Sequence, residues 1–421
     1  MADTLHIHDL APLGDGIHQS ETGRVYVDRA LPGDVVRVRT RREGGLLRGD
    51  VLELLEASPH RIKAPCVHYD VCGGCTLQHA EQSFYRDWKV ETVRRALHKQ
   101  GVTPETWRDT VFLPESKRRR VTFAALKKRA VVTLGYFRRR SHHVTEITDC
   151  LVADPAILAM RVKLRTDLAP LLMEGKGADI FIQSVNGHGE VVMTGAIGRK
   201  GFPDLQAHEA FAHIAQTLNI ARISWRSRAH DRPETMVERY PLTASFGVLN
   251  VPLPPLAFLQ PTEAGERALV DAVLELLPQS GRTADLFSGC GTFAGSFLKR
   301  GSVDAYENAA DAVTALDRAK GAAPLQVFRR DLYHDPLRAD EAARYDAIVF
   351  DPPRAGAEEQ AKALAGGKVP LIIGVSCNPI TFARDARILT EGGYRLESVK
   401  IIDQFTWTHH VELVAAFKRT I

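Results

Sequence analysis

Cys377 is the residue of this chain with the clearest chemical potential. It follows the apolar run 369–375, which we expect to be a buried strand, and reactive groups of open α/β sheets lie outside the carboxyl ends of their strands. Two other expected strands end in chemically distinctive segments: a glycine-rich turn at 287–291, and Asp-Pro-Pro-Arg at 351–354. Together the three segments predict a nucleotide-type cofactor beside a nucleophilic cysteine.

The cofactor is indicated by three successive strand ends. The turn Ser-Gly-Cys-Gly-Thr that ends at Thr292 lets a ligand approach the backbone at a helix N-terminus. Glu307 ends the next strand, where an acid typically hydrogen-bonds ribose hydroxyls, and Asp331 ends the third, where a carboxylate can accept from an adenine amino group. Each acid alone is equally well explained as a cap. Because the turn is neither a phosphate loop nor a full dinucleotide fingerprint, S-adenosylmethionine fits better than ATP or NAD.

Cys377 and Glu412 form a pair that suits methylation of carbon. C5 of uracil is a weak nucleophile, but a thiolate that adds to C6 converts the ring into an enolate. A base must then remove the C5 proton, and Glu412 opens the last expected strand. An isolated Glu is usually structural, so its value as a candidate base comes from its neighbours. Arg354 after Pro353 argues against an exocyclic nitrogen target, because amino-group methyltransferases carry an aromatic residue there.

Four of the six cysteines have the arrangement of a metal site. Cys66, Cys72 and Cys75 form C-x5-C-x2-C, and Cys150 lies downstream. Thiolates gathered in a chain without a secretory pattern bind zinc or an iron–sulfur cluster more often than they form disulfides. The five-residue gap is unusual for a zinc ribbon. The alternative, that these are merely small buried residues, is less favoured.

Composition and charge limit the class of protein. A chain of 421 residues with 44 % hydrophobic content and a net charge of +4 predicts two or three soluble domains. The first 19 residues lack the pattern of a signal peptide, and no run approaches the length of a membrane span, so we expect a cytoplasmic protein with no membrane partner, and we assume a monomer. Residues 117–140 hold ten Lys or Arg and no acid, which predicts an RNA surface, although a solvated basic face explains such a run as well. The candidate RNA contacts are Arg118, Arg119, Arg120, Arg138, Arg139 and Arg140.

The pattern of apolar residues divides the chain into three parts. Residues 1–57 read as short strands of an OB-type β-barrel. Residues 58–100 contain the cysteine segment and a helix at 81–99, and residues 101–255 are β-rich with a hairpin at Asn186-Gly187. From residue 256 helices and strands alternate, which predicts a Rossmann-like α/β domain with a mostly parallel, seven-stranded sheet. Its expected strands are 283–287, 302–307, 325–329, 345–350, 369–375, 394–402 and 411–417.

These motifs in combination resemble the bacterial RNA (uracil-C5) methyltransferases, in the branch with an N-terminal TRAM domain and a [4Fe-4S] cluster. The resemblance spans essentially the whole chain. It begins with Leu-Pro-Gly-Asp at 31–34 and Cys-Gly-Gly-Cys at 72–75, and continues through Phe-Leu-Gln at 258–260 and Asp-Pro-Pro-Arg at 351–354 to Ser-Cys-Asn-Pro at 376–379 and His-Val-Glu at 410–412. It implies a class I S-adenosylmethionine-dependent methyltransferase in which Cys377 is the nucleophile and Glu412 the base. The family's cluster ligands correspond to Cys66, Cys72, Cys75 and Cys150, and its cofactor contacts to Gln260, Phe287, Glu307, Asp331 and Asp351.

The chain departs from the family pattern in two loops. The family often has Asn at the position of Thr292, and a Pro-x-Thr where this chain has Thr406-Trp407-Thr408. The TRAM-like part and the cysteines favour 23S rRNA as the substrate over tRNA. Two rival functions remain. One is an RNA cytosine-C5 methyltransferase, but its usual nucleophile motif is missing, and Arg354 stands where that class has an additional cysteine after the Pro. The other is a non-catalytic RNA-binding factor, which has no need of Cys377 and Glu412.

Overall fold

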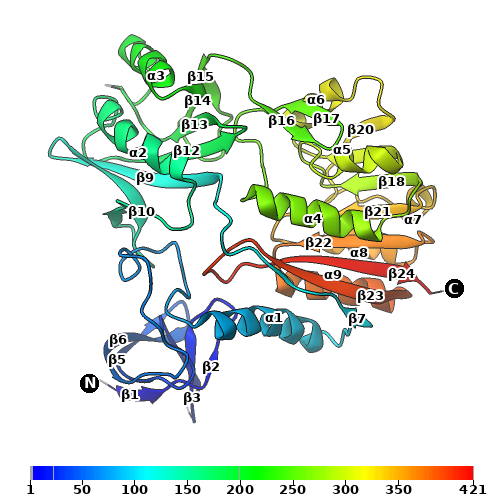
Figure 1. Ribbon diagram of the computed structural model, residues 1–421, viewed down its shortest axis with the longest axis horizontal. Helices are drawn as coiled ribbons and strands as arrows, with labels where there is room; N and C mark the ends of the chain where they lie inside the picture. Colours follow the sequence, from blue (N-terminus) through cyan, green and yellow to red (C-terminus); the bar gives the residue numbers. More distant parts are fainter. Residues whose placement is uncertain (1–2, 22, 199, 421) are drawn as a thin grey trace.

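The computed structural model describes residues 3–21, 23–198 and 200–420. Figure 1 shows a small β domain at the N-terminus, a second β-rich domain in the middle of the chain and an α/β domain that holds the C-terminus. The long helix α1 (Gln82–Lys99) connects the first domain to the last and packs on α9 (Pro379–Glu391). In the part of the chain that the structure describes, no helix has the length and apolar character needed to cross a membrane.

The α/β domain is built on a mixed sheet with the strand order β20-β19-β18-β21-β22-β24-β23-β7. The first five strands are parallel, and β24 is antiparallel to both of its neighbours. The chain runs outward from β18 to β20 and then returns to β21, so the topological switch lies between β18 and β21, where open α/β sheets bind ligands. The strands are β18 (Gly281–Leu286), β19 (Gly301–Glu307), β20 (Leu325–Arg329), β21 (Ala347–Phe350), β22 (Leu371–Ser376), β23 (Tyr394–Asp403), β24 (Glu412–Arg419), β7 (Thr106–Trp107) and β8 (Val111–Phe112).

Helices cover both faces of this sheet because its strands are apolar on both sides. One face packs against α4 (Glu263–Leu276), α5 (Ala294–Phe297) and α6 (Ala310–Ala319). The other packs against α1, α8 (Glu358–Ala365) and α9, and the short α7 (Ala339–Ala342) contacts α8. Because the helices cover the faces of the sheet, the carboxyl ends of the parallel strands stay accessible at one edge.

Two boundaries expected from the sequence differ in the structure. All seven expected strands are present, but β7 and β8 add to the sheet by pairing with β23, so the segment 106–112 belongs to the α/β domain. The hairpin of β16 (Thr243–Phe246) and β17 (Leu249–Pro252) packs in the same core. Both segments are too short to show an alternating rhythm, and only tertiary packing assigns them.

The central domain is a seven-stranded sheet in the order β11-β10-β9-β12-β13-β14-β15, with α2 (Pro155–Asp167) and α3 (Leu205–Thr217) packed in its core. The predicted hairpin is confirmed: Asn186 and Gly187 join β12 to β13 and both have positive φ, as a two-residue turn requires. The strands are β9 (Arg120–Lys128), β10 (Val131–Phe137), β11 (Val144–Glu146), β12 (Gly177–Val185), β13 (His188–Thr194), β14 (Ile220–Arg226) and β15 (Glu234–Glu238).

The N-terminal domain is a six-stranded sheet in the order β1-β5-β6-β4-β3-β2, folded around a small core that includes Val27 and Val38. The cysteine segment, residues 57–81, follows it without regular strands and leads into α1. The strands are β1 (Asp3–His6), β2 (Asp9–Leu10), β3 (Gly16–Ser20), β4 (Gly23–Val27), β5 (Val35–Glu43) and β6 (Leu46–Glu56).

Candidate active site and cysteine centre

A cavity of about 640 Å³ lies at the topological switch of the α/β sheet. Its walls bring together segments that are far apart in the sequence, from the start of β9 to the start of β24. All but one of the residues expected to bind the cofactor or to act in catalysis lie in these walls. They are Gln260, Phe287, Glu307, Asp331, Asp351, Cys377 and Glu412. Thr292, the remaining one, follows the glycine-rich turn and is not among the lining residues.

The glycine-rich turn and Glu307 form one end of this cavity. Asp285 is fully buried and accepts the amide of Ala294 at 2.9 Å, which folds the turn back over β18. The carboxylate of Glu307 accepts the amides of Gly289, at 2.9 Å, and Ala309, at 2.7 Å. These bonds fix the carboxylate at the end of β19, with lone pairs left to accept from a diol.

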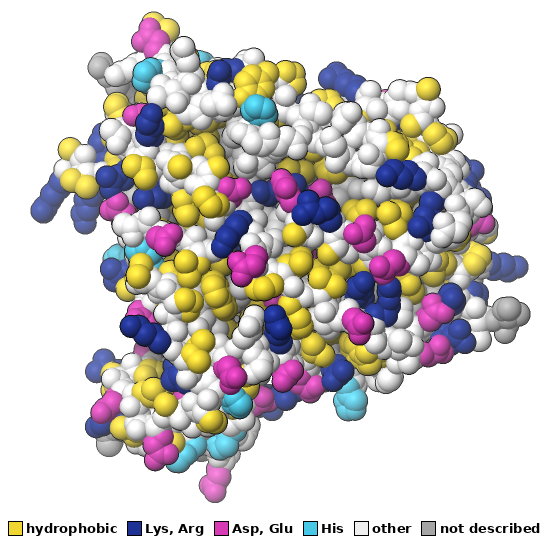
Figure 2. Space-filling view, in the orientation of Figure 1, with side chains coloured by type: hydrophobic (Ala, Val, Ile, Leu, Met, Phe, Trp, Pro, Cys, Tyr) yellow, Lys and Arg dark blue, Asp and Glu magenta, His cyan; other side chains and the backbone are white. Residues whose placement is uncertain are grey.

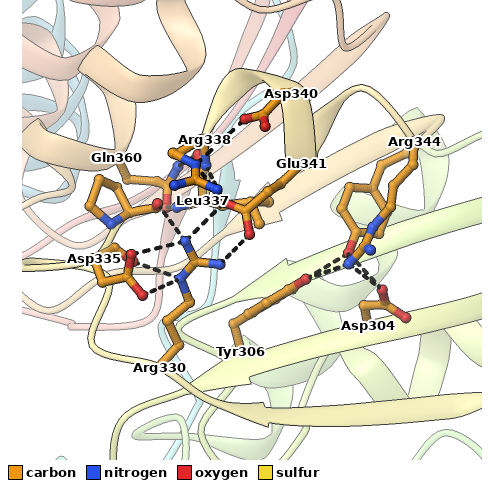
Figure 3. Close-up of polar contacts among 12 residues, drawn as sticks. Asp304, Tyr306, Arg330, Asp335, Leu337, Arg338, Asp340, Glu341, Arg344 and Gln360 are labelled. Atoms are coloured by element: carbon orange, nitrogen blue, oxygen red, sulfur yellow. Dashed lines mark hydrogen bonds and ion pairs between the residues drawn. The ribbon is translucent and has the colours of Figure 1, made fainter.

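A polar network fixes the loop that carries Asp331. Arg330 donates two hydrogen bonds to Glu341, at 2.8 and 2.9 Å, and also binds Asp335 (Figure 3). The pKa of Glu341 falls to about 2, chiefly because of its hydrogen bonds from Arg330. Asp331 then accepts the backbone amide of Tyr333 at 3.0 Å. The loop is therefore ordered by its own residues and presents Asp331 at the cavity wall.

A chain of amides connects the two ends of the cavity. Gln260 donates to Asp351 at 3.3 Å and accepts from Gln404 at 3.0 Å. The same Nε2 group of Gln404 lies 3.4 Å from Oε1 of Glu412. Gln404 is buried and abuts Gly265 of α4, where an added Cβ would lie 2.0 Å from Oε1 of Gln404. The carboxylates of Asp351 and Glu412 are thus held by one hydrogen-bonded network.

Cys377 lies between β22 and α9, at the position the sequence predicts. The N-cap of α9 is Asn378, whose side chain accepts the amide of Ile380 and donates to the carbonyl of Arg354 at 3.0 Å. Thr381 binds the same carbonyl at 3.2 Å. These bonds pin the Asp-Pro-Pro-Arg loop against the helix, so the nucleophile and the loop share a fixed geometry at a helix N-terminus, where a thiolate is favoured.

Burial dominates the ionisation of the three reactive groups. Burial raises the pKa of Cys377 to about 11, with Glu412 and Asp351 adding to the effect and Arg354 opposing it. Burial also raises the pKa of Asp351 to about 7 and the pKa of Glu412 well above its ordinary range. The thiol is therefore neutral at rest, and the buried Glu412 is a strong base once ionised.

An aromatic and a cation form the rim of the cavity. The guanidinium of Arg120 lies 4.2 Å from the ring centroid of Phe258, and Phe258 is 57 % exposed. Burial lowers the pKa of Arg120 to about 10, so the group stays a cation at neutral pH. A cation stacked on an exposed ring is the kind of surface that holds an unstacked base.

Cys66, Cys72, Cys75 and Cys150 line one separate cavity of about 370 Å³, as the sequence predicts for a shared site. Burial raises the pKa of Cys75 to about 11, and the pKa values of Cys66 and Cys72 rise for the same reason. No group of three or more His, Cys, Asp or Glu among the described residues surrounds a single ion position. Arg120 lines both this cavity and the active-site cavity, so the two sites are adjacent.

Comparison with known proteins agrees with this geometry. The family model for tRNA (uracil-5-)-methyltransferase matches residues 337–420. The chain is 39 % identical to an RNA methyltransferase of Brucella suis, over 98 % of this chain and 97 % of the relative. It is 31 % identical to the 23S rRNA (uracil(1939)-C(5))-methyltransferase RlmD of Acinetobacter baumannii, over 94 % of this chain and 89 % of that protein. The chain belongs to the RNA (uracil-C5) methyltransferase family.

The fold agrees with this family. The tRNA (uracil-54, C5)-methyltransferase of Pyrococcus abyssi, solved with S-adenosyl-L-homocysteine, superposes with a TM-score of 0.74 at 23 % identity, over 98 % of this chain and 99 % of that one. The likeness at this level of identity is one of architecture. It extends over all three parts of the chain, including the β-rich N-terminal half.

Only some of the arginines predicted to contact RNA are free to do so in the structure. Arg119 is buried and paired with Glu266 at 2.5 Å, while Arg118 and Arg120 face the cysteine cavity. Arg139 pairs with Asp28 at 2.9 Å, and Arg140 pairs with Asp15 at 2.6 Å, so both join the β10 end to the N-terminal domain. Arg138 is exposed.

The surface charge is mixed on the face seen in Figure 2, with basic and acidic side chains interspersed. Lys and Arg gather at the left edge of that view, over the tip of the β9–β10 hairpin, where the sequence reads Lys127-Lys128-Arg129. Besides the paired Arg140, the exposed cations of the predicted basic run are Lys117, Lys128, Arg129 and Arg138, and these are the side chains that a phosphate backbone can reach. Lys127 is half-buried and donates to the carbonyl of Ala169 at 2.7 Å.

Sequence reasoning missed several residues that support the catalytic groups. Gln404 is one, because a single Gln beside a strand carries no motif. Lys89 is another: it lies in a helix of mixed composition, yet it is 1 % exposed and paired with Asp403 at 2.9 Å. The sequence offers one signal: Lys89 falls among the apolar positions of α1 that face the core, where a lysine is unusual.

Proposed function

We propose that this protein transfers a methyl group from S-adenosylmethionine to C5 of a specific uridine in RNA. The observation that carries the proposal is that Cys377 and Glu412 line the same cavity as Glu307 and Asp331. A nucleophile and a base on one side of a nucleotide-sized cavity, with cofactor-type acids on the other, is what carbon methylation of a pyrimidine requires.

The first half of the reaction belongs to Cys377. Its thiolate adds to C6 of the uracil, and the electron pair that is displaced makes C5 the nucleophile. The bound S-adenosylmethionine supplies a sulfonium methyl group, which C5 takes, with S-adenosylhomocysteine as the leaving group. Burial opposes ionisation of the thiol; Arg354, the N-terminus of α9 and the cationic cofactor all favour it.

The second half belongs to Glu412. Its carboxylate removes the C5 proton, the C5–C6 double bond forms again, and the thiolate leaves. Gln404 donates to this carboxylate, and Arg120 and Arg354 lie close enough to favour its charged form. A buried base of raised pKa suits a carbon acid, because proton affinity is what the step needs.

The residues at the cofactor end fit an adenosyl group. We assign Glu307 to the ribose hydroxyls, Asp331 to the adenine amino group, and Gln260, Phe287 and Asp351 to the remaining wall. Thr292 keeps at most an indirect part in this assignment, because it lies outside the lining. The backbone of Phe287 has positive φ, a strained conformation that functional sites often retain.

The four cysteines fit an iron–sulfur cluster better than zinc. Four thiols around a cavity of about 370 Å³ leave room for a multi-atom centre, whereas a tetrahedral zinc site is closed around one ion. We propose that Cys66, Cys72, Cys75 and Cys150 hold a [4Fe-4S] cluster, which would link the cysteine segment to the central domain. Visible absorbance near about 400 nm separates the two metals, since zinc sites do not absorb there.

The favoured substrate is 23S rRNA. Support comes from the 31 % identity to RlmD over nearly the whole chain and from the N-terminal β domain, which we propose to be a TRAM-type RNA-binding barrel. tRNA is the second candidate, supported by the fold shared with the Pyrococcus abyssi enzyme. A cytoplasmic, monomeric protein stays a prediction.

Two measurements test the proposal. RNA that contains 5-fluorouridine should form a stable covalent adduct with the wild-type protein in the presence of the cofactor, because fluorine cannot leave as a proton; Cys377→Ala should form none. Mass-spectrometric mapping of 5-methyluridine in cells that carry Cys377→Ala should then show loss at one ribosomal uridine. Loss in tRNA instead would reassign the substrate. An unchanged RNA and no adduct would favour the cytosine-C5 and binding-factor alternatives.

A further inference from the structure

The turn that leads into Glu412 is held by the cysteine segment. The backbone amides of Thr76 and Leu77 both donate to the carbonyl of Trp407, at 2.7 and 3.0 Å. These two residues follow Cys75 directly. The amide of Trp407 in turn donates to the hydroxyl of Tyr85 on α1 at 3.1 Å.

Trp407 adopts a backbone conformation that it does not favour. Its φ is +60°, in the left-handed region, where a Cβ crowds the backbone. Such a conformation persists only where neighbouring contacts impose it. At Trp407, the two amides of the cysteine segment bind the carbonyl, and the hydroxyl of Tyr85 accepts the amide.

The side chain of Trp407 meets the cysteines as well. It packs against the small apolar cluster formed by Tyr69, Cys75 and Val152, at whose edge Cys66 and Cys150 also lie. A change in the position of these cysteines therefore reaches Trp407 through both its backbone and its ring.

The path from Trp407 to the base is short and fixed. Lys89 donates to the carbonyl of His410 and to Asp403, so both ends of the turn 403–410 are fastened to α1. Glu412 opens β24 two residues after His410. Because both ends are fixed, a displacement of the turn at Trp407 is confined to residues 404–409, and these include Gln404, whose side-chain amide donates to Glu412 at 3.4 Å.

We propose that the cysteine segment is a positioning element for the base: it sets the Trp407 turn, and through it the aim of the Glu412 carboxylate. The proposal rests on the function proposed above. When a metal centre is bound by the four cysteines, it stabilises this arrangement and so supports proton removal, with little effect on cofactor binding or on attack by Cys377. Thr76 and Trp407 act as positioning residues.

The decisive comparison uses Thr76→Pro, which deletes the amide donor, and Thr76→Val, which keeps both the donor and the shape. With 5-fluorouridine RNA, both variants should form the covalent adduct at the wild-type rate, since that reaction ends before the base acts. With uridine RNA, Thr76→Pro should accumulate the adduct and release the C5 proton at least about tenfold more slowly, as expected for the loss of about 1.4 kcal/mol of transition-state stabilisation. Thr76→Val should turn over normally.

A second pair of variants controls for misfolding caused by the proline. In Trp407→Asn the new residue tolerates positive φ but loses the packing on the cysteines, whereas Trp407→Phe keeps an aromatic ring. We expect adduct accumulation on uridine RNA for the first and not for the second. Normal turnover by both Thr76→Pro and Trp407→Asn would overturn the proposal, and so would the loss of 5-fluorouridine adduct in these variants, because the cysteine segment would then act on the whole site. Absence of the adduct with wild-type protein would instead contradict the proposed function.

Hydrogen exchange gives a readout that does not depend on activity. Reconstitution of the wild-type protein with iron and sulfide should slow amide exchange in peptides that cover residues 403–412, and Thr76→Pro should lose this protection. The same peptides in Thr76→Val should respond as in the wild-type protein. Protection that is confined to residues 66–79 in the wild-type protein would contradict the connection.

Discussion

The side-chain amide of Gln404 donates to the carboxylate of Glu412, the proposed base, at 3.4 Å. The same amide also donates to Gln260 at 3.0 Å, which in turn donates to Asp351. Gln404 has no room to withdraw, because Gly265 of α4 lies directly against it. The base is therefore positioned by a buried neutral group that is itself locked by packing.

Replacement of Gln404 by Leu should weaken the base step. The variant removes a hydrogen bond to the charged form of Glu412, so the pKa of this carboxyl should rise further above its ordinary range. Hydrogen bonds to charged groups contribute about 1.5–3 kcal/mol, which corresponds to a rate at pH 7 that is about tenfold or more lower. The pH profile of C5 proton release should shift to higher pH.

A second buried glutamine provides the matched control. Gln360 bonds the backbone of Leu337 at 2.9 Å, away from the cavity. Gln360→Leu should lower stability and leave the pH profile in place. A Gln404→Leu enzyme with the wild-type profile would show that Gln404 has no part in tuning Glu412.

Glu412→Gln should stabilise the protein increasingly as the pH rises. The folded-state pKa of Glu412 is raised well above 4.5 by burial, so the folded protein holds this proton more tightly than the unfolded chain does. The wild-type protein therefore loses stability as the pH rises from about 4.5 through the folded pKa. Because Gln does not titrate, the melting temperature of the variant minus that of the wild-type protein should grow between pH 5 and 8.

Glu358→Gln is the control for this measurement. Its carboxylate pairs with Lys362 on the surface of α8, which lowers the pKa of Glu358, so the group is ionised in the folded state throughout pH 5–8. The difference in melting temperature for this variant should stay flat over that window. Differential scanning fluorimetry of the RNA-free protein makes both measurements. A flat difference for Glu412→Gln would mean that its carboxylate is ionised at rest.

The sequence predicts the chemistry here better than it predicts the domain limits. Glu307, Asp331 and Cys377 lie at the predicted edge because each ends or follows a parallel strand, and parallel strands bring such ends together. Glu412 reaches the same edge because it opens β24, which runs antiparallel to its neighbours. The four cysteines share a cavity, as their spacing indicates. In contrast, the strands β7 and β8 have two residues each, too few for periodicity to identify.

The residues that position the chemical groups follow from packing, which a single sequence does not display. Arg139 and Arg140 look like RNA ligands in a basic run, but their acidic partners Asp28 and Asp15 lie more than a hundred residues away. Trp407 reads as an ordinary aromatic, and only the fold reveals its contacts with the cysteine segment. Long-range pairs of this kind decide which charges are free.

Among the charged residues of α1, replacement of Lys89 should lower the stability of the protein most. It is almost fully buried, and burial lowers its pKa to about 8 although Asp403 opposes this. Lys89→Met leaves the carboxylate of Asp403 buried without its cation, and breaking a buried pair costs about 3–5 kcal/mol. Urea unfolding at pH 7 should detect this loss, whereas Lys99→Met, at the exposed end of the same helix, should change stability by less than about 0.5 kcal/mol. Equal effects of the two variants would contradict the burial of Lys89.

Variants of Arg138 and Arg140 should distinguish a loss of RNA binding from a loosening of the N-terminal domain. Arg138 is exposed and donates to Thr145. Arg138→Glu should therefore weaken RNA binding and reduce the slope of its salt dependence by about 1, the contribution of one phosphate contact. The melting temperature of this variant should be unchanged.

Arg140 pairs with Asp15 of the N-terminal domain, and the side chain of Asp15 is only 5 % exposed. Arg140→Asp should place two acids together and loosen that domain, which limited proteolysis between residues 56 and 66 would detect.

A charge swap makes this last prediction specific. In Arg140→Asp combined with Asp15→Arg, the pair is restored with reversed polarity, so protease resistance should recover part of the way towards the wild-type protein. Recovery is incomplete because Asp15 also pairs with Arg48 at 3.2 Å and with Arg139 at 3.6 Å, so the swap places a third cation beside these two. If Arg140→Asp lowers RNA affinity as strongly as Arg138→Glu while the N-terminal domain stays protease-resistant, then Arg140 contacts RNA directly and the ion pair with Asp15 opens on binding.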